Sequence, residues 1–101
     1  MSIKGQKYAA RRDANDHPIK IAAEQMGWWL IRTDEPCDYW AALKSRPELG
    51  FRPIEIKTDV GVFTAAQEQF LLQCQQWRIP YMVWRSVEEM IEQTNTLRAA
   101  K

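Results

Sequence analysis

An alternation of isoleucine and charged side chains in the stretch 52–57 constrains the fold of this chain more than any other short segment. Successive side chains of a β-strand point to opposite faces, so Ile54 and Ile56 are predicted to face the core. Glu55 and Lys57 are then predicted to share the other face. A carboxylate and an amine are therefore expected side by side on one surface of a sheet.

The residues before this stretch predict a helix and two further strands. A helix with one buried face is predicted between an N-cap at Asp13 or Asn15 and a stop at Gly27. Residues 28–32 are aromatic and β-branched and predict a strand, and a second strand is predicted at 39–43. The polar connection that follows contains Pro and Gly, so the second and third strands are expected to form a hairpin.

Two capping boxes organise the second half of the chain. Thr64-Ala65-Ala66-Gln67 is predicted to open a helix. Its expected apolar stripe is Phe70, Leu71, Cys74 and Trp77. Residues 81–85 predict a strand, and Ser86 with Glu89 predicts a terminal helix. The expected order is α-β-β-β-α-β-α, a mixed α+β class within one domain over residues 1–101.

Length and composition narrow the class of protein. A chain of 101 residues accommodates one domain with a modest core, so support from a second copy is a reasonable expectation. Its 46% hydrophobic and 27% charged residues are typical of a globular protein. No apolar run approaches the roughly 20 residues of a membrane span, and the first residues lack the apolar stretch of a secretion signal. A cytoplasmic location is expected.

Cysteine and histidine are too few for several kinds of site. Cys37 and Cys74 stand alone and His17 is the only histidine, so the chain cannot build a zinc finger or zinc ribbon. Both cysteines are expected to be reduced, with Cys74 in the core. A single histidine also argues against nucleases that require a histidine base plus a histidine ligand, and against a Ser-His-Asp triad.

Charge is informative through its distribution, because the net charge is only +1. Lys4, Lys7, Arg11 and Arg12 precede the first acidic residue, Asp13. Such an arm over residues 1–12 either neutralises DNA phosphates beside an active site or is a frayed, solvated terminus. The sequence leaves both alternatives open.

Asp38 is predicted to join Glu55 and Lys57, because it begins the neighbouring strand. Two converging carboxylates form the oxygen-rich site that Mg²⁺ or Mn²⁺ prefers, and the carbonyl of Ile56 can complete the coordination. Lys57 would orient an attacking water or hold a phosphate. Phosphodiester hydrolysis needs a water made nucleophilic at neutral pH and neutralisation of the charge that builds on the phosphoryl oxygens. A bound metal ion supplies both.

The spaced motifs together resemble a known family. In order they are Arg11-Arg12-Asp13-Ala14-Asn15-Asp16, Pro36-Cys37-Asp38, Ile54-Glu55-Ile56-Lys57, Thr64-Ala65-Ala66-Gln67 and Val83-Trp84-Arg85-Ser86-Val87-Glu88-Glu89. This pattern is similar to the PD-(D/E)xK nucleases, and within them to the stand-alone VRR-NUC domains of phages and prophages. The resemblance implies a restriction-endonuclease-like αβββαβ core with a mixed four-stranded sheet between helices. It also implies Mg²⁺-dependent or Mn²⁺-dependent cleavage of DNA, structure-selective on branches such as Holliday junctions, by a homodimer that needs no small-molecule cofactor.

Carried over residue by residue, the resemblance makes Asp38 and Glu55 metal ligands and Lys57 the catalytic lysine. Asp16 would match the acid of the first helix, although a first-turn carboxylate also favours the helix dipole. Gln67 would match the glutamine of the second helix, although it also fits a capping box.

Two features of this sequence leave the assignment open. Cys37 departs from the family pattern, in which Pro directly precedes the Asp, and the loop acids Asp34 and Glu35 are alternatives to Asp38 if the register differs. A second functional hypothesis is a non-catalytic nucleic-acid-binding or assembly protein that retains the nuclease fold.

Overall fold

The computed structural model of the chain describes residues 14–58 and 60–100. The helices of this part are α2 (Asp16–Gln25), α3 (Ala65–Gln76) and α4 (Val87–Ala99), and the strands are β1 (Trp28–Arg32), β2 (Tyr39–Leu43), β3 (Arg52–Ile56) and β4 (Met82–Trp84). A short 3-10 helix, η1 (Pro47–Leu49), lies in the connection between β2 and β3. The predicted order of elements and the mixed α+β class are confirmed.

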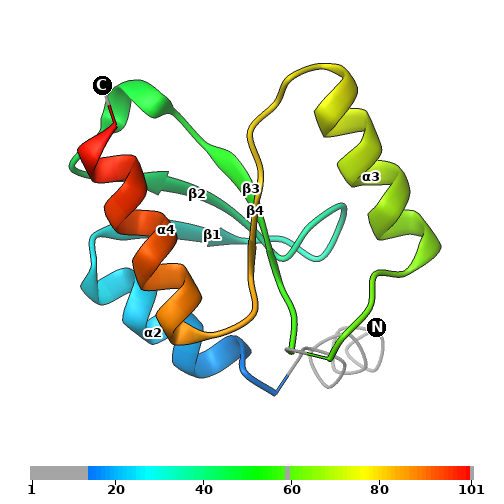
Figure 1. Cartoon of the computed structure of the whole chain (residues 1–101), viewed down its shortest axis with the longest axis horizontal. Helices are drawn as coiled ribbons and strands as arrows, with labels where there is room; N and C mark the ends of the chain where they lie inside the picture. Colours follow the sequence, from blue (N-terminus) through cyan, green and yellow to red (C-terminus); the bar gives the residue numbers. More distant parts are fainter. Residues whose placement is uncertain (1–13, 59, 101) are drawn as a thin grey trace.

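The four strands form one mixed sheet in the order β1-β2-β3-β4. β1 with β2 and β2 with β3 are antiparallel, whereas β3 and β4 are parallel, so α3 is the crossover between the last two strands. The predicted hairpin between the second and third strands is confirmed. α2 and α4 lie on one side of the sheet and α3 lies on the other (Figure 1).

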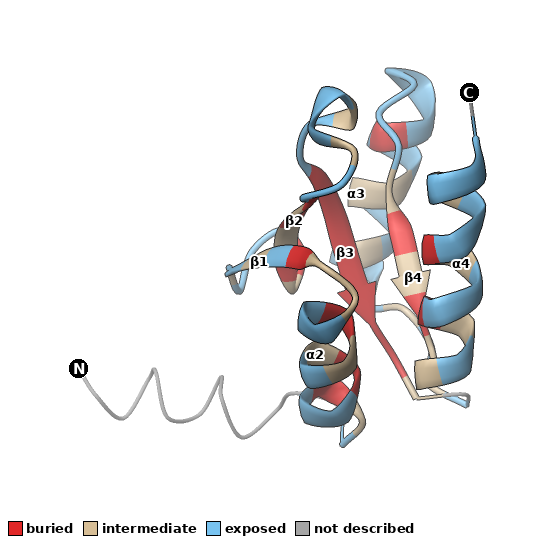
Figure 2. Cartoon of the chain, turned by 90° about the vertical axis from the view of Figure 1, so that its left-hand side faces the viewer, coloured by how far each residue is buried: buried red, intermediate tan, exposed pale blue. Residues whose placement is uncertain are grey.

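The core lies between the sheet and the pair α2 and α4. Trp28, Tyr39, Ile54 and Trp84 are at most 2% exposed, and the indole rings of Trp28 and Trp84 meet edge to face at 5.4 Å. Full burial of an apolar side chain such as that of Ile54 contributes about 1.5 to 3 kcal/mol. β3, at the centre of the sheet, is buried along its whole length (Figure 2). The residues of the central strand are thus held by packing on every side.

α2 begins and ends at the predicted places, although its start is stabilised differently. Asn15 is the N-cap residue, but its side chain makes no cap hydrogen bond and is directed to other parts of the chain. The alternative cap, Asp13, lies outside the described residues. Gly27 ends the helical pattern with φ of +99°, a conformation that glycine adopts without strain.

α3 stands apart from the core, which corrects one expectation. Its capping box is formed as predicted, with reciprocal hydrogen bonds between Thr64 and Gln67. Cys74 is buried, as predicted, but Trp77 is 64% exposed and does not belong to the core. α3 stands apart from the sheet, on the other side from α2 and α4 (Figure 1), so Cys74 is the one residue of this helix that is buried.

α4 closes the fold with stabilised ends. Ser86 caps it by accepting from the amide of Glu89, as predicted, while the Glu89 carboxylate accepts from the amide of Arg85. At the other end, Arg46 Nη1 donates to the carbonyls of Leu97 and Ala100. No helix in the described ranges is long and apolar enough to cross a membrane.

Candidate functional site

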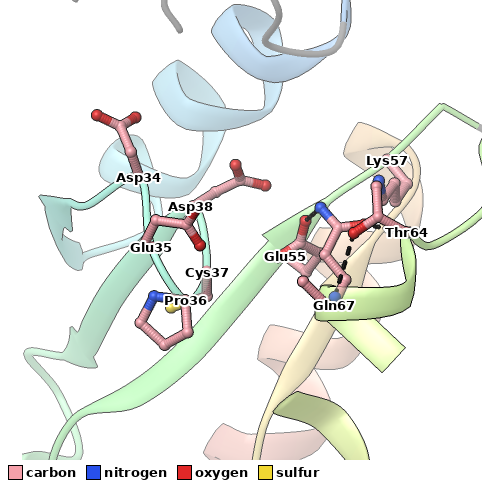
Figure 3. Close-up of a pocket in the computed structure, with 10 residues that line it drawn as sticks. Asp34, Glu35, Pro36, Cys37, Asp38, Glu55, Lys57, Thr64 and Gln67 are labelled. Carbon is pink, nitrogen blue, oxygen red and sulfur yellow. Dashed lines mark hydrogen bonds between the residues drawn. The ribbon is translucent and has the colours of Figure 1, made fainter. Parts of the chain in front are cut away.

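A cavity of about 420 Å³ opens where β2 begins and β3 ends. Its walls come from three segments: the loop before β2, the end of β3 with the next residue, and the first turn of α3. The lining residues are Asp34, Glu35, Pro36, Cys37, Asp38, Glu55, Lys57, Thr64, Ala66 and Gln67. Figure 3 shows residues 34–38 gathered on one side, opposite Glu55, Lys57, Thr64 and Gln67. The structure therefore brings the four predicted catalytic residues to one place.

Asp38 is fixed to β3 by its main chain and its side chain. Its amide donates to the carbonyl of Ile54 at 3.1 Å, and its Oδ2 accepts from the amide of Ile56 at 2.8 Å. Regular pairing of β2 with β3 reaches only Tyr39 opposite Ile54, so the carboxylate takes the place of a strand partner for Ile56. The two bonds lie on either side of Glu55 in the sequence and hold the two carboxylate-bearing residues at a fixed spacing.

Glu55 is held from the opposite wall by Gln67. Gln67 Nε2 donates to Glu55 Oε2 at 2.7 Å, while Gln67 Oε1 accepts from the amide of Thr64 at 2.9 Å (Figure 3). Because the capping box requires the oxygen at Thr64, the amide nitrogen has to point at Glu55. The two interpretations of Gln67 from the sequence are therefore compatible, since one side chain caps α3 and orients the carboxylate.

Lys57 follows directly after β3 and extends its pairing, because its amide donates to the carbonyl of Trp84 at 3.1 Å. The residue is only 8% exposed. Its ammonium lies 5.6 Å from the centre of the Phe63 ring, a distance at which a cation is attracted to an aromatic face. Lys57 lines the cavity, and within the described part of the chain its ammonium has no salt bridge.

Cys37 presents a protonated thiol to the cavity. The residue is 3% exposed, and its Sγ donates to the carbonyl of Tyr39 at 3.2 Å. Burial raises the pKa of this thiol to about 12, with further contributions from the negative charges of Glu55 and Asp38. The thiolate is the form that binds metals and attacks electrophiles, so Cys37 is a poor candidate for either role near neutral pH.

Asp16 lies outside the cavity lining. Its Oδ1 accepts from the hydroxyl of Tyr39 at 2.9 Å, and both residues are buried. Tyr39 points to the core face of the sheet, whereas Asp38 before it lines the cavity on the other face. Metal contact by Asp16 stays a prediction. In the structure its carboxylate accepts the hydrogen bond from Tyr39, which links α2 to β2.

The donor set can be compared with the needs of a divalent cation. Among the described residues, no three His, Cys, Asp or Glu side chains lie close enough together to hold a metal ion by themselves. Mg²⁺ needs fewer protein ligands than this, because it commonly keeps several waters and takes one or two carboxylates plus substrate phosphates. Since the N–H and C=O of one strand residue project to the same side, the Ile56 carbonyl faces Asp38 as its amide does. Asp38, Glu55 and the Ile56 carbonyl fit such a ligand set.

The remaining predicted residues lie at the rim of the cavity or outside the described residues. Asp34 and Glu35, the alternatives to Asp38, are exposed cavity residues, and Asp34 lies 3.9 Å from Arg32. Lys4, Lys7, Arg11 and Arg12, the basic arm, lie outside the described residues. The lining within the described ranges thus carries four carboxylates and one ammonium, a balance that favours cations.

Two residues near the site could not be assigned from the sequence. Asn15 Nδ2 donates to the carbonyls of Lys57, at 2.6 Å, and Arg85, at 2.9 Å. Arg85 in turn donates to the loop after Lys57. The sequence contained only a partial signal for Arg85, which ends the predicted strand 81–85 as Lys57 ends the stretch 52–57. The parallel pairing of Ile56 with Trp84 in the structure then places the two residues side by side. For Asn15 there was no such signal, because the preference of Asn for a helix N-cap explains this position without any long-range contact.

Comparisons of the chain with protein-family models, with curated proteins and with solved structures found no match. The residues and their geometry therefore carry the functional argument.

Proposed function

We propose that this chain is a divalent-metal-dependent endodeoxyribonuclease of the PD-(D/E)xK type, resembling stand-alone VRR-NUC domains. One observation carries the proposal: Asp38, Glu55 and Lys57 line the same cavity, and Gln67 fixes the Glu55 carboxylate there. Two carboxylates and a lysine in one cavity suit phosphodiester hydrolysis, which needs an activated water and neutralisation of charge on the phosphoryl oxygens.

Each residue has a separate task in this proposal. Asp38, Glu55 and the carbonyl of Ile56 would hold Mg²⁺ or Mn²⁺, which would supply an activated water and neutralise charge on the phosphoryl oxygens. Lys57 orients the attacking water or holds the scissile phosphate. Gln67 keeps Glu55 in the cavity by donating to Oε2. Asp38 combines its ligand task with the support of β3 through Ile56.

The substrate is proposed to be DNA with a branch, such as a Holliday junction, in the processing of phage or prophage DNA. The described residues form one mixed sheet with its helices, and the candidate site lies within it. Selection would then depend on backbone contacts and on the geometry of a homodimer, since phosphate contacts position a protein without reading sequence. The basic residues Lys4, Lys7, Arg11 and Arg12 would supply phosphate contacts.

Cleavage of a four-way junction and of a linear duplex of the same sequence, each with Mg²⁺, Mn²⁺ or EDTA, tests the proposal. We expect metal-dependent cutting, faster on the junction, and a loss of roughly 100-fold or more in Glu55→Gln and Lys57→Met. Glu92→Gln and Lys44→Met change the same residue types at exposed positions outside the cavity and should cut as wild type does.

Equal activity in Glu55→Gln, Lys57→Met and wild type would mean that another protein in the preparation cuts the DNA, and the proposal would be wrong. Binding of the junction without cleavage in any metal would instead support the non-catalytic binding protein.

A further inference from the structure

Arg85 holds the loop that follows the candidate catalytic lysine. Its Nη1 donates to the carbonyls of Thr58 and Gly61, each at 2.7 Å. The amide of Gly61 also donates to the carbonyl of Thr58, which closes a tight turn. A Cβ at Gly61 would lie 2.9 Å from Thr58 Oγ1, so a side chain there would force Thr58 to shift. One guanidinium therefore fixes both ends of this turn.

The same guanidinium shares an aromatic ring with Lys57. Phe63 lies two residues after the turn, and its ring centre is 5.7 Å from Arg85 Cζ and 5.6 Å from Lys57 Nζ. Both distances are within the range of a cation–π contact, about 6 Å. Because Phe63 follows the turn closely in the chain, we expect the position of its ring, and with it the contact to the Lys57 ammonium, to depend on the turn that Arg85 holds.

The main chain links the two cationic residues as well. Asn15 Nδ2 donates to the carbonyls of Lys57 and Arg85 together. Ile56 pairs with Trp84 in the parallel ladder, so Lys57 and Arg85 leave their strands side by side. Arg85 is absent from the cavity lining, which separates it from the residues that would touch DNA or metal there.

We propose that Arg85 is a positioning residue, which sets the direction of the Lys57 ammonium through Phe63 and the hydrogen-bonded pair Thr58 and Gly61. The inference rests on the proposed function for its catalytic meaning. An ammonium on a flexible four-carbon stem has many rotamers, and displacement by about 1 Å from a productive geometry can cost on the order of 100-fold in rate. Loss of the Arg85 bonds would release the loop and with it the ring that confines Lys57.

NMR of the full chain with labelled lysine side chains tests the positioning without reference to activity. The Lys57 side-chain signals, assigned from their loss in Lys57→Met, should be displaced by the ring current of Phe63. In Arg85→Met and Phe63→Leu they should move to the positions of ordinary exposed lysines, whereas Phe63→Tyr should preserve the displacement. Arg46→Met is the matched control, because Arg46 also donates through Nη1 to main-chain carbonyls, at the far end of α4.

Cleavage kinetics on the same variants then connect position to catalysis. We expect Arg85→Met and Phe63→Leu to lower kcat by about 10- to 100-fold with KM little changed, and Phe63→Tyr to retain most of kcat. Arg46→Met should unfold more easily than wild type and yet keep its kcat.

The results separate this inference from the proposed function. An unchanged Lys57 signal in Arg85→Met, or a loss of kcat in Arg46→Met equal to that in Arg85→Met, would overturn the positioning role. A wild-type protein that cuts no DNA would overturn the proposed function, while the Lys57 signals would still decide whether Arg85 positions the lysine.

Discussion

Gln67 and Glu55 are joined by a hydrogen bond of 2.7 Å that connects the first turn of α3 to the central strand. The other end of the Gln67 amide is fixed by Thr64, so the requirements of a helix cap determine which group faces the carboxylate. A residue that serves a helix and a site at once can be tested by a change that preserves only one of these functions.

Gln67→Glu is that change. Glutamate keeps the oxygen that caps Thr64, but it places a second negative charge against Glu55. We expect the variant to be less stable than wild type by about 1 to 2 kcal/mol in EDTA, and Mn²⁺ to restore much of the loss by neutralising the pair. Urea unfolding with and without Mn²⁺ measures this. Gln69→Glu, an exposed change on the same helix, is the control and should show no such metal response.

The two roles of Asp38, as a proposed metal ligand and as the acceptor for the Ile56 amide, can be separated in a similar way. Asp38→Asn retains an oxygen for the Ile56 amide, whereas Asp38→Ala leaves that amide without its acceptor, at a cost of about 1 to 3 kcal/mol. We expect Asp38→Asn to have nearly wild-type stability but at least about tenfold weaker Mn²⁺ binding. Calorimetric titration with Mn²⁺ and urea unfolding distinguish the two variants. Wild-type Mn²⁺ affinity in Asp38→Asn would remove Asp38 from the ligand set.

Asn15→Asp should be strongly destabilising, because it replaces the Nδ2 donor with an acceptor facing two carbonyls. We expect a loss of about 2 to 3 kcal/mol at pH 7. The carboxyl can donate once it is protonated, and the two facing carbonyls raise its pKa in the folded chain, so the loss should shrink as the pH falls from 7 toward about 4, the value of the unfolded carboxyl. Asn95→Asp, an exposed change of the same type on α4, should unfold almost as wild type does. Thermal unfolding over this pH range makes the comparison, and equal effects of the two changes would contradict it.

Ionisation of the Cys37 thiol is expected to lower the stability of the folded protein at alkaline pH. Burial raises the pKa of the folded thiol to about 12 from 9.0, so above pH 9 the unfolded chain loses a proton that the folded chain keeps. Stability from this group is therefore constant below pH 9 and falls by up to about 1.4 kcal/mol per pH unit up to pH 12. Cys37→Ala lacks this dependence.

Unfolding free energies at pH 7 and pH 10 provide the test. The difference between wild type and Cys37→Ala should shrink by about 1 kcal/mol at the higher pH, and a constant difference would show that the thiol ionises normally.

The strands were the most predictable part of the fold. The bounds of β1 and β2 coincide with the predicted segments, because aromatic and β-branched residues there end at clear loop signals. Glu55 and Lys57 both line the cavity, as the alternation of the stretch 52–57 predicted. Local periodicity was sufficient in these cases, since strand neighbours decide which face a side chain takes.

Features that depend on distant segments could not be predicted in this way. Trp77 completes a helical stripe in the sequence, and only the placement of α3 away from the core exposes it. Asn15 fits a helix cap locally, while its observed partners lie 42 and 70 residues further along the chain. Asp16 likewise has a partner, Tyr39, that no spacing rule indicates. Propensity describes the neighbours of a residue in sequence, whereas these contacts follow from tertiary packing.

The bridging amide of Asn15 has a consequence for how the protein acquires its site during synthesis. Its partners lie near positions 57 and 85, so closing these contacts requires long chain loops and comes late in folding. When synthesis has passed α3, Asp38, Glu55 and Lys57 are all present in the chain, but β4 is still missing. The nascent chain would therefore carry these three side chains before the contacts that hold the end of β3 can form.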